Sequence, residues 1–131
     1  MIDLEALVSQ VLDTAFAVHS DLGPGLLENV YEQVLANRLS RQGLKIVRQM
    51  PVGACIDGLD FPEAFRLDLL VERRLVVEVK AVERIIPVHA RQTLTYLRLM
   101  KLPLGLLINF GGITLKEGVK RVANNYRQDK I

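Results

Sequence analysis

The stretch 65–81, FRLDLLVERRLVVEVKA, constrains the fold of this chain most strongly. Two runs rich in leucine and valine flank a short charged connection, which predicts a β-hairpin. Pairing Val71 with Leu75 across that connection sets Asp68 directly opposite Glu78. Two opposed carboxylates would lie about 5 Å apart and repel each other. The hairpin therefore predicts an unfavourable pair that needs a neutralising neighbour or a function.

Side chains alternate between the two faces of such a hairpin. One face is expected to be wholly apolar, with Phe65, Leu67, Leu69, Val71, Leu75, Val77, Val79 and Ala81. The other face is expected to carry Arg66, Asp68, Glu78 and Lys80, together with Leu70 and Val76. On the hairpin alone two interpretations stay open: a solvated face of mixed charge, or a site built on the two acids.

The composition bounds the class of protein. Half of the 131 residues are hydrophobic and 24% are charged, which predicts one globular domain over residues 1–131. The net charge of +2 neither requires nor excludes a nucleic-acid partner. The lone Cys55 excludes an internal disulfide and a multi-cysteine metal site. No apolar run reaches the ~18 residues of a membrane span, and the start does not resemble a signal peptide, so a cytoplasmic protein without membrane contact is expected.

Periodicity predicts the remaining elements. Helices are expected over 3–22, 26–42, 88–101 and 115–126, and strands over 45–56 (bent near Pro51 and Gly53) and 104–110. The last helix would carry Lys116, Lys120, Arg121 and Arg127. The run 104–110 is apolar without alternation, which suits a strand buried on both faces and parallel to a neighbour. The resulting α/β (α+β) chain, in the order ααβββαβα, predicts a mixed β-sheet flanked by helices.

Several polar residues lie on or beside the apolar faces of these helices. His19 falls on the apolar side of the first helix and is interpreted as a packed core residue. The second helix is expected to bury Leu27, Val30, Tyr31, Val34 and Leu35, with Glu28 at the margin and Glu32 towards solvent. In the third helix, one face carries Val88, His89, Gln92, Tyr96 and Leu99.

The opposed acids suggest a specific chemistry. Mg²⁺ is typically held by one or two carboxylates and keeps several waters, and binding it would relieve the repulsion between Asp68 and Glu78. Lys80 lies about 6.6 Å along the strand from Glu78 on the same face. Its ammonium could orient a metal-bound water and stabilise charge that develops on a phosphate during attack.

The spacing of these residues resembles a known family. Asp68, nine intervening residues and then Glu78-Val79-Lys80, in this order of elements, resembles the PD-(D/E)XK nuclease superfamily, whose restriction-endonuclease-like fold holds the motif on a central hairpin. The segment 25–31, GLLENVY, is similar to the G-x-x-E-x-x-Y signature of the GxxExxY proteins within that superfamily. The resemblance runs from about His19 to Val122.

The resemblance implies roles for individual residues. Asp68 and Glu78 would ligate Mg²⁺, with Mn²⁺ as a substitute, and the backbone carbonyl of Val79 would add a ligand. Lys80 would be the catalytic lysine, and Glu28 the helical acid that joins the metal site, usually through water.

On the third helix, Gln92 and Tyr96 match the Q-x-x-x-Y element that supports the active site and DNA contact in exonuclease relatives. His89 resembles a recurrent histidine of unassigned role. Leu67 stands where the superfamily motif often has proline.

Two functions are consistent with these observations. The first is a Mg²⁺-dependent nuclease that hydrolyses DNA phosphodiester bonds. The second is a catalytically silent nuclease-fold module that binds nucleic acid or a protein partner, because the chain has few aromatic residues for stacking on bases. The intact set of Glu28, Asp68, Glu78 and Lys80 favours the enzyme. A homodimer is also plausible because one small domain offers little surface to hold a duplex.

Overall fold

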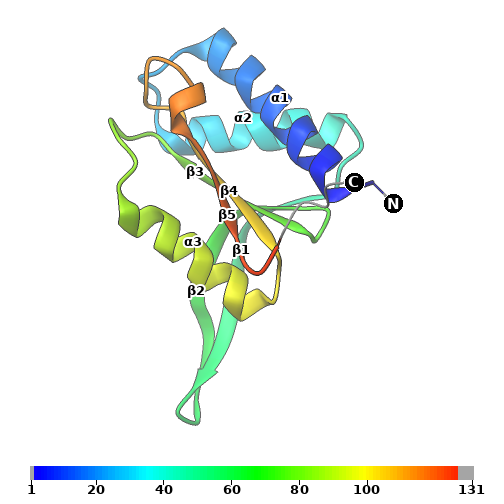
Figure 1. Cartoon of the computed structure of the whole chain (residues 1–131), viewed down its shortest axis with the longest axis vertical. Coiled ribbons are helices and arrows are strands. Elements are labelled where there is room, and N and C mark those ends of the chain that lie inside the picture. The colour runs from blue at the N-terminus through cyan, green and yellow to red at the C-terminus, as the bar shows by residue number, and fades with distance from the viewer. Residues whose placement is uncertain (1, 127–131) are drawn as a thin grey trace.

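The computed structural model describes residues 2–126 and contains a five-stranded mixed sheet flanked by three helices (Figure 1). The elements in chain order are α1 (Leu4–Leu22), α2 (Glu28–Arg41), β1 (Ile46–Ile56), β2 (Leu59–Val71), β3 (Leu75–Lys80), α3 (Pro87–Met100), β4 (Leu104–Asn109), the 3₁₀ turn η1 (Lys116–Gly118) and β5 (Val119–Ala123). The sheet has the order β1-β2-β3-β4-β5. The predicted fold class is confirmed.

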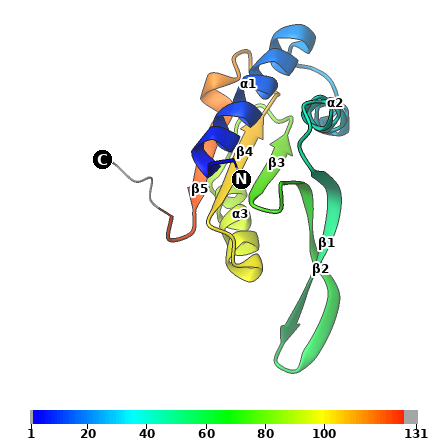
Figure 2. The ribbon, with the colours of Figure 1, turned by 90° about the vertical axis from the view of Figure 1, so that its right-hand side faces the viewer.

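Two apolar clusters show which helix covers which face of the sheet. The larger one joins α1 and α2 to side chains such as Leu69, Val77 and Ile108. The smaller one joins Val76 to Leu97 of α3. Helix α3 therefore covers the face opposite to α1 and α2 (Figure 2). Within the described part of the chain, no helix is both long and apolar enough to cross a membrane.

The central strands follow the predicted pairing. β2 and β3 are antiparallel, with Val71 opposite Leu75 as expected. β4 is buried along its whole length and runs parallel to β3, which confirms the prediction for an apolar run without alternation. β3 therefore ends beside the end of β4, with Lys80 next to Asn109.

The predicted division of the hairpin into two faces is wrong at its open end. The regular pairing of β2 with β3 stops at Leu69 opposite Val77, before it reaches Asp68. Leu67 and Phe65 consequently pack in the smaller cluster with Val76, and not on the face of Leu69. The alternation fails because it assumes an unbroken ladder, and this ladder ends one residue earlier.

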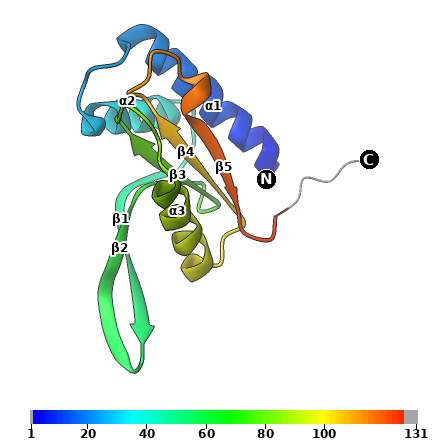
Figure 3. The ribbon, with the colours of Figure 1, turned by 60° about the vertical axis from the view of Figure 1, so that its left-hand side comes forward.

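Beyond that point β1 and β2 continue as a two-stranded ribbon that first packs against α3 and then extends past it, away from α1 and α2 (Figure 3). The register shifts between Val52 and Ala54, where a bend was expected near Pro51 and Gly53. β2 begins at Leu59, earlier than the predicted hairpin strand, because its first residues pair with the end of β1, with Leu59 opposite Ile56. The Val71–Leu75 register, if continued, also predicts Arg66 opposite Lys80. That prediction is wrong, because Arg66 lies on the ribbon and forms an ion pair with Glu63 at 2.6 Å.

The predicted last helix, 115–126, is also wrong. One 3₁₀ turn is followed by β5, which pairs antiparallel with β4. Gly118 makes this possible, because a Cβ there would lie 2.5 Å from the carbonyl oxygen of Asn109. The backbone of buried β4 needs hydrogen-bond partners on its outer side, and β5 supplies them. Lys116, Lys120 and Arg121 lie in these elements, and Arg127 lies outside the described residues.

The loop before α2 differs from the sequence prediction. The helix begins at Glu28. Leu27 and Val30, which were expected to be buried, are exposed, and Leu27 exposes 77% of its surface. Tyr31 orders this loop: its hydroxyl donates to the carbonyl of Gly23 at 2.6 Å and accepts the N–H of Leu26 at 3.1 Å. Its ring stacks on Phe110 at 4.8 Å. The tyrosine of the GLLENVY segment thus fixes the chain that leads into α2.

Tyr31→Phe tests this role. The change keeps the stacked ring but leaves a backbone donor and a backbone acceptor of the loop without their partner, which typically costs about 1–3 kcal/mol. Urea denaturation followed by circular dichroism should show that loss of unfolding free energy. Stability equal to that of the wild type would mean that the hydroxyl does not hold the loop.

Candidate metal centre

The structure brings Asp68 and Glu78 together, although the strand ladder does not extend to them. Oδ2 of Asp68 accepts the N–H of Val79 at 2.8 Å, and Oε2 of Glu78 accepts the N–H of Asp68 at 3.4 Å. In both contacts a backbone N–H donates to a carboxylate oxygen of the other strand. In a continued ladder the acceptor would be a backbone carbonyl oxygen. Backbone N–H groups therefore hold one oxygen of each acid.

Glu78 is buried beside a second acid, which has a strong electrostatic consequence. Only 5% of its surface is exposed, and among the described residues its Oε1 has no hydrogen-bond partner. Burial, followed by hydrogen bonding and repulsion from Asp68, raises its pKa to about 10, and the nearby Lys80 ammonium offsets only part of this rise. Because Glu78 is buried, the interpretation of this hairpin face as a solvated face of mixed charge is excluded.

Helix α3 contributes the cover over these acids. Tyr96 stacks on Phe65 with ring centroids 4.2 Å apart. Its pKa is raised first by burial and then by the negative charges of Glu78 and Asp68, so its hydroxyl lies within their field. Gln92, one turn earlier, is exposed.

His89 lies at the start of α3 and has a structural contact. Its Nδ1 accepts the N–H of Ile86 at 3.2 Å, which caps the helix. This contact gives His89 a structural role that involves neither acid of the pair.

Helix α2 supplies a buried acid, Glu32, that its helical period predicts to face solvent. Glu32, expected to face solvent, is only 3% exposed, whereas Glu28 is half-buried at the first position of the helix. Burial raises the pKa of Glu32, an effect that hydrogen bonding to Arg48 opposes and the charge of Asp68 reinforces. Ala36 is the sequence signal that could have identified Glu32 as buried. Including it among the apolar residues widens the buried face of α2 to Tyr31, Glu32, Leu35, Ala36 and Leu39.

Gln49 of β1 connects this helix to the acid pair. Its Nε2 donates to Oε1 of Glu32 at 2.6 Å and lies 3.4 Å from Oδ1 of Asp68. Arg48, the preceding residue, forms an ion pair with Glu32 at 2.8 Å. No sequence signal identified Gln49, because a glutamine in a predicted strand has no pattern of its own.

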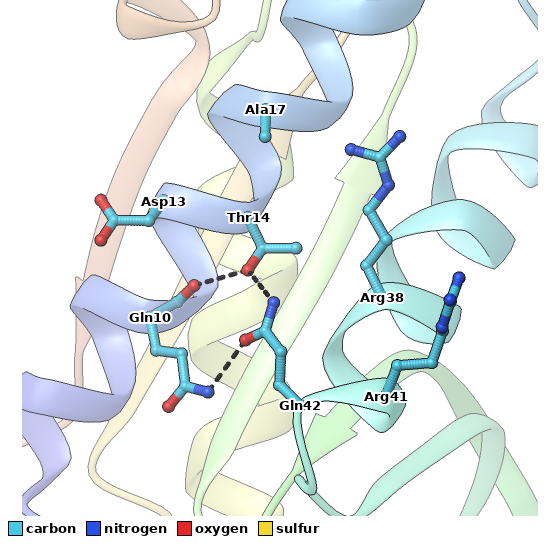
Figure 4. A pocket seen from close by; sticks show the side chains of 7 residues that line it. All are labelled: Gln10, Asp13, Thr14, Ala17, Arg38, Arg41 and Gln42. Atoms are coloured by element: carbon cyan, nitrogen blue, oxygen red, sulfur yellow. Dashed lines mark hydrogen bonds between the residues drawn. The ribbon is translucent and has the colours of Figure 1, made fainter.

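Two other features lie apart from the acid pair. His19 is buried with Nε2 2.9 Å from the carbonyl oxygen of Gly112, which confirms its interpretation as a packed core residue. A cavity of about 630 Å³ lies between α1 and α2 (Figure 4), and its wall includes hydrogen bonds among Gln10, Thr14 and Gln42. None of its lining residues belongs to the predicted site.

The donor set can be tested against a divalent cation. Among residues 2–126, no group of three or more His, Cys, Asp or Glu side chains is arranged to hold a metal ion, so Glu28 does not form a ligand triad with the pair. The pair itself fits: Oε1 of Glu78 is a buried oxygen without a partner, next to a second acid. Carboxylate oxygens of this kind suit Mg²⁺, which completes its coordination with water.

Glu78→Gln tests the electrostatic cost. Between pH 4.5 and about 10 the unfolded chain has lost the Glu78 proton while the folded chain retains it, so metal-free stability falls as the pH rises through this range. Glutamine removes that dependence and should add up to about 3 kcal/mol of unfolding free energy at pH 7.

Urea denaturation at pH 5 and pH 8 measures this effect, with the exposed Glu83→Gln as the matched control. A Glu78→Gln protein that is less stable than the wild type at pH 8 would contradict a protonated, buried carboxyl.

Comparison with known proteins identifies one family. The family described as the PD-(D/E)XK nuclease superfamily matches residues 5–122. No curated protein and no solved structure matches the chain.

Proposed function

The chain belongs to the PD-(D/E)XK nuclease superfamily, and we propose on this basis that it is a Mg²⁺-dependent nuclease that hydrolyses DNA phosphodiester bonds, with Mn²⁺ as a substitute. One observation carries the proposal: the buried, unpartnered Oε1 of Glu78 beside Asp68. A charged cation replaces a proton favourably at such a position.

In this proposal Asp68 and Glu78 hold the metal, the carbonyl of Val79 adds a ligand, and Glu28 contributes through water. The bound metal would supply Lewis-acid stabilisation of phosphate charge and a more acidic water. The contribution of the protein is a dry, fixed donor pair, because both carboxylates are anchored to backbone N–H groups.

Lys80 is proposed to orient the attacking water and to stabilise charge on the phosphate. It is half-buried at the end of β3. Its positive charge lowers the pKa of Glu78, so the ammonium group is close enough to interact electrostatically with the acid pair. Tyr96 is proposed to line the substrate side. Gln92 is proposed to contact DNA from the exposed surface of α3, and His89 to support that surface by capping the helix.

A binding module without catalysis is the second candidate, and one observation favours it. Three cavities of the described residues, including the one between α1 and α2, are lined without Asp68, Glu78 or Lys80. A binding module needs no substrate cleft at these three residues, whereas a nuclease needs one there or a partner, such as a second copy or another protein, that completes it.

Lys80→Ala tests the enzymatic proposal. With Mg²⁺ or Mn²⁺, the wild type should cleave one or more of single-stranded, duplex, flap and junction DNA, and the variant should lose roughly 10²–10⁴-fold in rate. Lys45→Ala, at an exposed lysine beside the β2–β3 turn and therefore at the opposite end of β3 from Lys80, is the matched control and should cleave normally.

Cleavage that persists in excess chelator, or that survives Lys80→Ala, would contradict the assigned roles. Metal-dependent thermal stabilisation without cleavage of any of these DNA forms would favour the binding module.

A further inference from the structure

Gln49 has an unusual backbone for a residue inside a strand. Its φ is +50°, in the left-handed region that residues other than glycine rarely adopt. The ladder between β1 and β2 pairs Arg48 with Leu69 and Met50 with Leu67, and Gln49 and Asp68 between them are not paired. Strained backbone of this kind costs about 1–3 kcal/mol and concentrates at functional sites.

The strained backbone places the Gln49 amide between two acids. Its Nε2 lies 2.6 Å from Oε1 of Glu32 and 3.4 Å from Oδ1 of Asp68, so one amide group faces both carboxylates. Because Glu32 is buried and Gln49 is exposed, Glu32 is the fixed member that orients the amide.

Both oxygens of Glu32 are already used. Oε2 accepts two N–H groups of Arg48, at 2.8 and 3.2 Å, and Oε1 accepts Gln49. Three N–H donors on two oxygens therefore hold the Glu32 carboxylate in one orientation. Its short, charged hydrogen bonds suit an anchor.

Both oxygens of Asp68 are likewise contacted, from two different strands. Oδ1 faces the amide of Gln49 from β1, and Oδ2 accepts the N–H of Val79 from β3. Two donors on separate oxygens fix the plane of a carboxylate, whereas a single donor would let it rotate. The Val79 contact alone would leave one degree of freedom, which Gln49 removes.

We propose that Gln49 is a positioning residue that presents Asp68 to the divalent cation, and that Glu32 acts through Gln49 as its buried anchor. This inference rests on the proposed function, because the cation at Asp68 belongs to it. Under this proposal α2 contacts the site through Glu32 and through Gln49 of β1, independently of Glu28.

A double-mutant cycle on metal affinity tests the coupling. Titration calorimetry with MnCl₂, without DNA, would be performed on the wild type, Gln49→Met, Glu32→Gln and the double variant. Methionine keeps the length of the side chain and removes the amide, and loss of such an outer contact typically weakens metal affinity by about 10–100-fold. Glu32→Gln should weaken it less, because it keeps one acceptor for Gln49. Gln33→Met, at an exposed position of α2, is the matched control and should bind like the wild type.

The double variant decides the mechanism. If Glu32 acts through Gln49, the double variant should bind Mn²⁺ no more weakly than Gln49→Met alone. If the effect of Glu32→Gln is undiminished in the Gln49→Met background, Glu32 acts on the cation directly, and its role as an anchor is overturned. Wild-type affinity in Gln49→Met overturns the positioning role and leaves the proposed function standing. A wild type that binds no Mn²⁺ overturns both.

Discussion

The contact between the buried carboxyl group of Glu78 and that of Asp68 is the interaction on which the rest of this structure depends. Burying an acid beside another acid is unfavourable, as the elevated pKa of Glu78 shows. The fold tolerates it because each acid accepts a backbone N–H from the opposite strand. Those donors are available only because the β2–β3 ladder ends at Leu69. The end of the ladder therefore allows the two acids to come together, with the unfavourable burial of Glu78 as a consequence.

The layers of the fold hold this pair from two sides. Helix α3 covers it with Tyr96, whose ring is itself fixed on Phe65. Helix α2, on the other face of the sheet, reaches it at the β1 edge through Glu32 and Gln49. The loop that leads into α2 is held in turn by the hydroxyl of Tyr31. Elements distant in sequence therefore converge on two carboxylates.

The sequence could predict those parts of the fold that depend on pattern alone. The Val71–Leu75 register follows from alternation around a short turn, and the buried parallel strand β4 follows from an unbroken apolar run. The site pair follows from the same register, even though its geometry departs from the ladder.

The parts that could not be predicted depend on tertiary contacts. β5 reads as a helix because nothing local reveals that β4 needs a partner or that Gly118 must approach Asn109. Glu32 was placed in solvent because its partner Arg48 lies on another element. Gln49 has no signal in the sequence, because its left-handed backbone arises only in the folded strand. Local patterns carry no information about such pairings.

The central claim is that Asp68 and Glu78 form a cation site, and anomalous diffraction from crystals grown with Mn²⁺ tests it most directly. The account predicts one anomalous peak at coordination distance, about 2.0–2.3 Å, from Oε1 of Glu78 and from a carboxylate oxygen of Asp68. The peak should be absent from crystals of Glu78→Gln. A well-ordered wild-type crystal without a peak between these two acids, or with Mn²⁺ bound only elsewhere, would contradict the account.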